Sequence, residues 1–216
     1  MKPTTDALLQ LCLSSQALRF GSFTLKSNRI SPYFFNSANL HSAHSLALLA
    51  QAYADALTPL SFDILFGPAY KGIPLIAATA VELDRRGKGS VEWCYDRKEQ
   101  KQHGEGGDLV GASLKHKRIV ILDDVITAGT AIRQSIEKIK QHEGILVGII
   151  ILLDRQEQGK DTQESAVQQI QREFHVPVLA ILTLDGLITY LQDNHASGQD
   201  ENLESMLQYR KQYGIH

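Results

Sequence analysis

The chain has 216 residues, of which 43% are hydrophobic and 21% charged, values that exclude a disordered or fibrous protein. This length suits one domain that buries roughly 70% of the surface exposed by its unfolded chain, so the fold needs no disulfide or structural metal. The net charge of −2 provides no overall basic surface, and we expect neither nucleic acid nor a membrane as a partner.

The two cysteines, Cys12 and Cys94, are far apart in the sequence, which excludes a zinc-finger spacing and fits a reducing compartment. The beginning of the chain has no apolar run followed by a cleavage site, so no secretion signal is indicated. The longest apolar run, residues 145–153, is too short to cross a bilayer. We therefore expect a cytoplasmic protein.

The predicted elements begin with a small N-terminal appendage. Asp6 caps an amphipathic helix, and the alternating residues 23–26 and the aromatic run 33–35 flank a polar corner, as in a hairpin. A second helix is predicted over residues 42–57, before Pro59.

From residue 64 onward, strands and helices alternate. Strands are predicted over residues 64–66, 91–95, 118–122, 145–153 and 178–182, and helices over residues 73–85, 130–142, 163–174 and 203–213. This alternation is typical of an α/β fold with a parallel sheet, and the continuous apolar strands predict burial on both faces. Ligands of such sheets bind at the carboxyl ends of the strands. One long segment, residues 96–111, has the composition of a functional loop.

The strongest chemical signal is the segment VILDDVITAGT, residues 120–130. Its end opens a helix, whose unpaired backbone N–H groups and positive dipole can bind a phosphate, and Gly129 permits close approach. Asp123 and Asp124 precede this turn, where carboxylates can accept hydrogen bonds from sugar hydroxyls or hold a hydrated Mg²⁺. The pattern predicts a phosphoribosyl site. An acidic strand end and an ordinary helix cap would explain either half alone.

A second signal is the segment DRKEQKQHGEGG, residues 96–107, which is basic at its start and rich in glycine at its end. Cations on such a loop can fold over a diphosphate, neutralise its growing charge and exclude water. Taken alone, a charge run of this kind is more simply a solvated loop.

Together these motifs resemble a known family. The segment 120–130 is similar to the signature of type I phosphoribosyltransferases, which use 5-phosphoribosyl 1-diphosphate (PRPP), and RKEQKQHGEGG resembles the catalytic loop of the orotate phosphoribosyltransferases. Three further stretches match that family in order: SPYFFN at 31–36, FGPAYKGIP at 66–74 and LDRQE at 153–157. The resemblance implies a single domain over residues 1–216 with the type I phosphoribosyltransferase fold. Its mostly parallel central sheet would be flanked by helices, with a core at about 60–190 and an N-terminal helix and hairpin, at about 1–40, as a hood over the active site.

The resemblance also implies a role for each matching residue. The expected PRPP contacts are Lys26, Tyr70, Lys71, Arg97, Lys98, Lys101, His103, Asp123, Asp124, Val125, Ile126, Thr127, Ala128, Gly129, Thr130 and Ala131. The expected orotate contacts are Phe34, Phe35, Thr127 and Arg155, and the expected catalytic residues are Lys101, His103, Lys98, Arg97, Asp123 and Asp124. Mg²⁺ would be held mainly by PRPP, assisted by the two aspartates. Without the other motifs, Arg155 would be interpreted as a surface ion pair, and the two phenylalanines as hairpin core.

The implied reaction is the Mg²⁺-dependent transfer of the phosphoribosyl group from PRPP to N1 of orotate, giving orotidine 5′-phosphate and diphosphate in pyrimidine biosynthesis. His103 is a candidate proton donor to the leaving group. In this family the mobile loop reaches the neighbouring subunit's site, so the resemblance implies a homodimer. Lys26, Arg97, Lys101 and His103 would then act across the interface, and Lys98 in its own chain.

Two other functions compete with this one. A phosphoribosyltransferase for a purine or uracil would share residues 120–130 but not the loop RKEQKQHGEGG, Lys26 or the Phe34-Phe35 hairpin. A PRPP-sensing regulator would usually add a DNA-binding segment and could lack the catalytic loop.

One local departure leaves the hairpin geometry open: residues 37–40 read SANL, where relatives carry a glycine near position 38.

Overall fold

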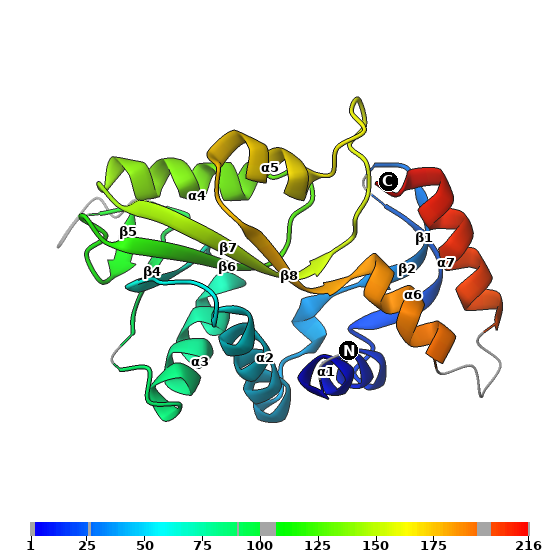
Figure 1. Ribbon diagram of the computed structural model, residues 1–216, viewed down its shortest axis with the longest axis horizontal. Coiled ribbons are helices and arrows are strands. Elements are labelled where there is room, and N and C mark those ends of the chain that lie inside the picture. The colour runs from blue at the N-terminus through cyan, green and yellow to red at the C-terminus, as the bar shows by residue number, and fades with distance from the viewer. Residues whose placement is uncertain (1–2, 26, 90, 100–106, 194–199, 216) are drawn as a thin grey trace.

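The computed structural model describes residues 3–25, 27–89, 91–99, 107–193 and 200–215 (Figure 1). Three of the expected PRPP residues, Lys26, Lys101 and His103, lie outside these ranges, and so does most of the segment RKEQKQHGEGG.

A six-stranded sheet in the order β5-β4-β3-β6-β7-β8 forms the centre of the molecule. Its strands are β3 (Ile64–Gly67), β4 (Glu92–Asp96), β5 (Leu109–Gly111), β6 (Arg118–Val125), β7 (Ile145–Asp154) and β8 (Val178–Thr183). All neighbouring strands are parallel except β5, which runs antiparallel to β4. The expected α/β fold with a mostly parallel sheet is confirmed.

Helices cover both faces of the sheet (Figure 1). They are α1 (Pro3–Ser14), α2 (Ala43–Ala56), α3 (Gly72–Arg85), α4 (Thr130–Gln141), α5 (Ala166–Phe174), α6 (Leu184–Asp193) and α7 (Asp200–Tyr213). In β6, Val120 and Leu122 pack into the core cluster shared with α2 and α3, whereas Ile119 and Ile121 pack into the cluster shared with α4 and α5. All four side chains are fully buried, which confirms the expected burial on both faces.

The expected N-terminal hairpin is present as a separate two-stranded sheet. Its strands, β1 (Leu18–Thr24) and β2 (Ile30–Phe35), are antiparallel, and a short 3₁₀ turn, η1 (Ser37–Asn39), follows them. The hairpin lies beside α7 (Figure 1), where the ring of Tyr33 meets that of Tyr209 edge-on at 6.4 Å between centroids. Two distant parts of the sequence therefore form one layer at this end of the sheet.

Several elements differ from the sequence-based predictions. α1 begins at Pro3, so Asp6 lies within its first turn and does not cap it. β1 covers Leu18–Thr24, which is earlier than the predicted residues 23–26. β6 continues through Val125, because β7 still pairs with it there, so both aspartates lie within the strand. The short strand β5 falls inside the predicted loop 96–111. α5 begins at Ala166 rather than at residue 163, because Ser165 and Gln168 form a capping box. α6 was not predicted, although its buried residues have helical spacing: Leu184, Leu187, Ile188 and Leu191.

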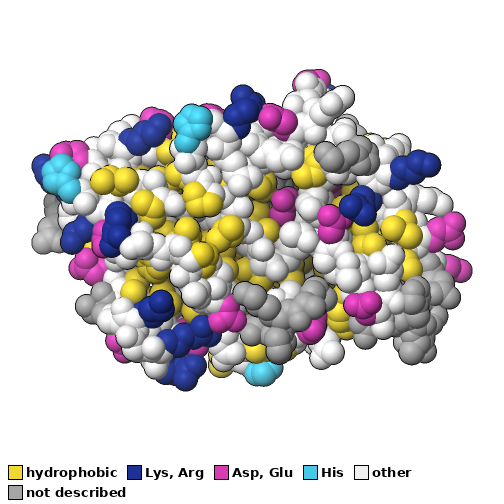
Figure 2. Space-filling view, in the orientation of Figure 1, with side chains coloured by type: hydrophobic (Ala, Val, Ile, Leu, Met, Phe, Trp, Pro, Cys, Tyr) yellow, Lys and Arg dark blue, Asp and Glu magenta, His cyan; other side chains and the backbone are white. Residues whose placement is uncertain are grey.

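Positive and negative side chains are interspersed around the rim of the face shown in Figure 2, and hydrophobic side chains gather in its middle. Within the described ranges, none of the helices combines the length and hydrophobicity needed to cross a bilayer. Both cysteines are free and buried, and burial raises the pKa of each thiol to about 12.

Candidate active site

The predicted motifs converge at one edge of the sheet. The segment around Tyr70 follows β3, Arg97 follows β4, residues 126–129 follow β6, and Arg155 follows β7. Because these four strands are parallel neighbours, their carboxyl ends meet at the same edge. Four segments therefore surround one site, although Tyr70 and Arg155 are about 85 residues apart in the sequence.

The two aspartates at the end of β6 are buried but differ in their partners. The Oδ1 atom of Asp123 accepts a hydrogen bond from the backbone N–H of Asp124 at 2.8 Å, and the Tyr53 hydroxyl donates to the Asp123 carbonyl at 2.7 Å. Burial, followed by the nearby charge of Asp124, raises the pKa of Asp123 to about 6. Asp123 therefore has a carboxylate whose ionisation falls near neutral pH.

Asp124 is hydrogen-bonded to residues of two other segments. Its Oδ2 atom accepts hydrogen bonds from Lys71 Nζ at 2.6 Å and from the Ser37 hydroxyl at 2.5 Å. Lys71 is the residue before α3, and Ser37 begins η1 after the hairpin. A cavity of about 320 Å³ opens beside them, lined by Ser37, Leu40, Lys71, Leu75, Asp124 and Leu152. Ser37 was not predicted as a site residue; it lies in the segment SANL, residues 37–40, whose geometry the sequence left open.

Residues 126–129, which we call the phosphate loop, join β6 to α4. Gly129 is the residue before the helix and adopts left-handed backbone angles, φ 76° and ψ 4°. The side chain of Ile126 is buried in the core beneath the loop, so its backbone is the part that faces a ligand. Among the described residues, no group accepts a hydrogen bond from the backbone N–H of any residue from 127 to 132. The start of α4 therefore has the free donors that a phosphate needs.

A buried carboxylate at the end of β4 holds the neighbouring segments together. Asp96 accepts a hydrogen bond from the Ala69 backbone N–H at 2.7 Å and pairs with Lys138 Nζ at 2.6 Å. The backbone N–H of Arg97 donates to the Asp108 carbonyl at 2.7 Å, which closes the base of the predicted catalytic loop. Of the predicted cations, Arg97 is half-buried and Lys98 is exposed. Sequence patterns did not indicate that Asp96 is a buried structural carboxylate, because its partners come from distant segments.

The predicted orotate contacts lie near the hairpin. Arg155 directs Nε and Nη2 to Glu157 Oε1 at 2.7 and 2.6 Å, and Nη2 also donates to the Ser31 hydroxyl at 3.0 Å. Its guanidinium lies 4.2 Å from the centroid of the Tyr33 ring. Glu157 in turn accepts a hydrogen bond from the Tyr209 hydroxyl at 2.9 Å, so α7 supports the arginine. The planar fork expected for orotate is thus already paired on one side.

Phe34 and Phe35, the phenylalanines predicted to contact orotate, are half-buried in different surroundings. The ring of Phe34 lies 5.5 Å from that of Phe23, with the Arg19 guanidinium 5.5 Å away, whereas Phe35 packs against the main core cluster. Tyr70, by contrast, is 70% exposed at the edge of the site.

The carboxylates at the end of β6 are a donor set that can help to hold a magnesium ion. Asp123 and Asp124 offer carboxylate oxygens, the ligand type that Mg²⁺ prefers, but one oxygen of Asp124 already has two partners. The described residues contain no group of three acidic, histidine or cysteine side chains placed to hold a metal. Two carboxylates supply only part of the six oxygen ligands of a magnesium ion, so these residues fit an ion that takes its other oxygens from elsewhere.

Comparison with known proteins agrees with this geometry. The phosphoribosyl transferase domain family matches residues 38–180. The orotate phosphoribosyltransferase of Acinetobacter baumannii (strain ACICU) is 50% identical over 211 residues, which cover 97% of this chain and 96% of that protein. The chain belongs to the orotate phosphoribosyltransferase family. The family resemblance drawn from the sequence motifs is confirmed.

Solved orotate phosphoribosyltransferases have the same fold. The Francisella tularensis enzyme superimposes with a TM-score of 0.86 at 38% identity, over 96% of this chain and 99% of that one. The Mycobacterium tuberculosis orotate phosphoribosyltransferase in complex with PRPP shares the fold at a TM-score of 0.63 and 17% identity, over 86% of this chain and 99% of that one.

Proposed function

We propose how this site carries out the reaction of its family, the transfer of the phosphoribosyl group from PRPP to N1 of orotate. The observation that carries the proposal is the shared sheet edge, where the paired carboxylates of Asp123 and Asp124 adjoin free backbone donors. The phosphate loop, with Val125, Thr130 and Ala131 at its ends, binds the 5-phosphate. The two aspartates accept hydrogen bonds from the ribose hydroxyls.

The remaining residues are assigned to the diphosphate and to orotate. Tyr70 and Lys71 contact the diphosphate from the segment after β3. Five cationic residues complete the binding of the diphosphate: Lys26, Arg97, Lys98, Lys101 and His103. Orotate lies between Arg155 and the hairpin residues Phe34 and Phe35, with Thr127 at its other edge. The short distance between the hairpin and Arg155, 3.0 Å from Ser31, supports this placement.

The chemistry follows from where charge develops. As the bond between C1 of the ribose and the diphosphate oxygen breaks, the ribose becomes positive and the departing diphosphate gains negative charge. Lys71, Lys98, Lys101 and His103 stabilise that negative charge, and His103 donates a proton to the leaving group. N1 of orotate arrives deprotonated and forms the new bond to C1, so no strong base is required. Mg²⁺, held mainly by PRPP with the help of Asp123 and Asp124, would add charge neutralisation at the diphosphate.

We propose that about residues 1–40 form a hood over this site, within a single domain whose core spans about residues 60–190. Two contacts support the hood. Ser37 donates to Asp124 at the PRPP end, and Ser31 accepts from Arg155 at the orotate end. The second hairpin strand and the turn after it therefore contact residues proposed to bind each of the two substrates.

We also propose a cytoplasmic location. Its support is chemical: Cys12 and Cys94 are both unpaired thiols, the form that cysteines keep in a reducing compartment.

The test of the function is the loss of orotate absorbance when the purified protein is mixed with PRPP and Mg²⁺. We expect loss with orotate and none with uracil or hypoxanthine, because the latter two lack the carboxylate that Arg155 would bind. Consumption of hypoxanthine or uracil would instead support a different acceptor. Binding of PRPP without consumption of any base would support the sensing function.

Active sites shared across a homodimer are a separate proposal, which a mixing experiment tests. A Lys101→Ala chain is combined with a chain carrying Asp123→Asn and Asp124→Asn, each inactive alone. Random mixing should restore about a quarter of wild-type activity, because half of the dimers are mixed and each of these has one intact site. Activity no higher than the sum of the two parent proteins, in dimers shown by light scattering to have exchanged, would contradict sharing.

A further inference from the structure

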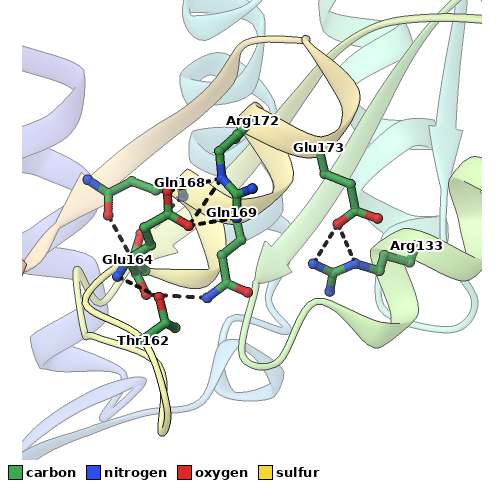
Figure 3. A network of polar contacts seen from close by, with 8 residues as sticks. Arg133, Thr162, Glu164, Gln168, Gln169, Arg172 and Glu173 are labelled. Carbon is green, nitrogen blue, oxygen red and sulfur yellow. Dashed lines mark hydrogen bonds and ion pairs between the residues drawn. The ribbon is translucent and has the colours of Figure 1, made fainter.

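Arg133, on the first turn of α4, reaches back to the phosphate loop. Its Nη1 atom donates a hydrogen bond to the Ala128 carbonyl at 3.1 Å. The other side of the guanidinium faces α5, where Nε and Nη2 both lie 2.8 Å from Glu173 Oε2 (Figure 3). One arginine therefore connects the loop to two helices, α4 and α5.

The guanidinium also lies directly against Gly129. A Cβ atom built on that glycine would be 2.7 Å from Arg133 Nη1 and 3.4 Å from Ile170 Cδ1. A real Cβ does not approach another atom as closely as 2.7 Å, so a side chain at position 129 would displace the end of the flexible Arg133 side chain from its place. The Arg133 guanidinium therefore lies next to the left-handed glycine at position 129.

The contact with the Ala128 carbonyl determines which way the next N–H group points. In a trans peptide unit the C=O and the following N–H lie in one plane and point in opposite directions. Because Arg133 holds the oxygen of Ala128, the N–H of Gly129 is directed away from the guanidinium. That N–H has no acceptor among the described residues and lies at the helix start, where the phosphate is proposed to bind.

We propose that Arg133 is a positioning residue that presets the Ala128–Gly129 peptide for the 5-phosphate of PRPP, and that Glu173 holds Arg133 in place. The inference rests on the proposed function, because it assigns the phosphate to this loop. The effect is geometric, since Glu173 offsets the arginine's charge. An N–H donor that is already oriented loses no conformational entropy when the ligand binds. Loss of the Arg133 contact that orients it should therefore weaken phosphate binding.

A second arginine–glutamate pair nearby serves as a matched control (Figure 3). Arg172 on α5 directs Nη2 to Glu164 Oε2 at 2.8 Å and Nε to both carboxylate oxygens at 3.1 and 3.2 Å. Its described hydrogen bonds go to Glu164 and to no residue of the phosphate loop. Loss of this exposed pair should have little effect on any property of the protein.

The experiment compares Arg133→Met, Glu173→Gln and Arg172→Met in the full-length chain. Ribose 5-phosphate binding is measured by calorimetry, and the KM values for PRPP and orotate by the absorbance assay. We expect Arg133→Met to raise the Kd for ribose 5-phosphate and the KM for PRPP about tenfold, the scale of one charge-assisted hydrogen bond. Glu173→Gln should raise both about threefold, while the KM for orotate and all values for Arg172→Met stay within about twofold of wild type.

Several outcomes would overturn the inference. One is an Arg133→Met protein that melts at the wild-type temperature and has a Kd for ribose 5-phosphate within twofold of the wild-type value. Another is an Arg133→Met protein whose KM for orotate rises as much as its KM for PRPP. If Arg133→Met fails to fold, Glu173→Gln decides, because it keeps the shape of the side chain; unchanged binding in that variant contradicts the proposal. If the wild type neither consumes orotate nor binds PRPP, the proposed function itself fails, which is distinct from an active wild type with an unaffected Arg133 variant.

Discussion

Replacement of Asp123 by asparagine should make the protein more stable at neutral pH and nearly inactive. The folded chain raises the pKa of this carboxyl from its ordinary value of 3.8 to about 6, chiefly because the group is buried. The ionised form is therefore disfavoured in the fold. The stability associated with the protonated form is fully present below pH 3.8 and is lost as the pH rises through about 6.

The size of the stability effect follows from the shift. A difference of about two pH units corresponds to about 3 kcal/mol at most above pH 6, and an asparagine, which cannot ionise, avoids that loss. Its amide oxygen can still accept the Asp124 N–H. Urea unfolding at pH 5 and pH 8 measures the effect: the gain of Asp123→Asn over wild type should be larger at pH 8. An equal or lower stability of the variant at pH 8 would contradict a buried, costly carboxylate.

The same substitution should lower kcat/KM for PRPP by about 100-fold or more, the scale of losing one preorganised polar group. An amide presents an N–H₂ donor where the ribose hydroxyl needs an acceptor. For the same reason, wild-type activity should fall as the pH drops through about 6, where Asp123 gains its proton. Normal turnover of the variant would remove Asp123 from the site.

Asp63 provides the control of opposite sign. Its carboxylate lies far from the site and accepts hydrogen bonds from the side chain and the backbone N–H of Arg118, and these lower its pKa to about 2. A lowered pKa means that stability is present above pH 3.8 and is lost as the pH falls through about 2. Asp63→Asn should therefore lower stability at neutral pH and leave kcat/KM unchanged.

Replacement of Gly129 by alanine should weaken PRPP binding at least about tenfold. An alanine at the left-handed backbone angles of this residue costs about 1–2 kcal/mol, and its Cβ would meet the Arg133 guanidinium. The loop can relieve both problems by turning its backbone, which moves the N–H groups away from the phosphate. The KM for PRPP and the Kd for ribose 5-phosphate measure this result.

Gly87 separates the backbone cost from the loss of function. It has a similar φ of +74°, but a Cβ there would meet nothing within 4 Å. Gly87→Ala should therefore lower stability by about 1 kcal/mol and leave PRPP binding unchanged. If both alanine variants bind PRPP like wild type, the phosphate loop has no role in binding.

Much of the architecture could be predicted because its signals are local. The apolar runs in β6 and β7 and the helical spacing of apolar residues in α2 identify their elements directly, and the alternation of strand and helix gives the parallel sheet. The segment Asp123 to Thr130 predicts the phosphoribosyl site because its chemistry is contiguous. α6 was missed even though its buried leucines have helical spacing, because it follows β8 without a loop.

The unpredicted parts of the site depend on contacts between distant segments. Nothing around Ser37 indicates that its hydroxyl reaches Asp124, 87 residues away. Asp96 looks like the start of a charged loop, yet it is buried against Lys138. Arg155 was expected to contact orotate, and its pairing with Glu157 depends on how the loop after β7 folds. Side-chain partners of this kind follow from the tertiary structure, which local patterns do not contain.

In the free protein, the acidic end of the site already has its own counter-ion. The Lys71 ammonium and the Ser37 hydroxyl both donate to one oxygen of Asp124. In the proposed mechanism, a ribose hydroxyl that takes this oxygen displaces the lysine, and the freed ammonium lies on the segment that contacts the diphosphate. Substrate arrival would thus transfer a cation from the sugar end to the leaving group, so that the charge assisting bond cleavage would become available only once the substrate is bound.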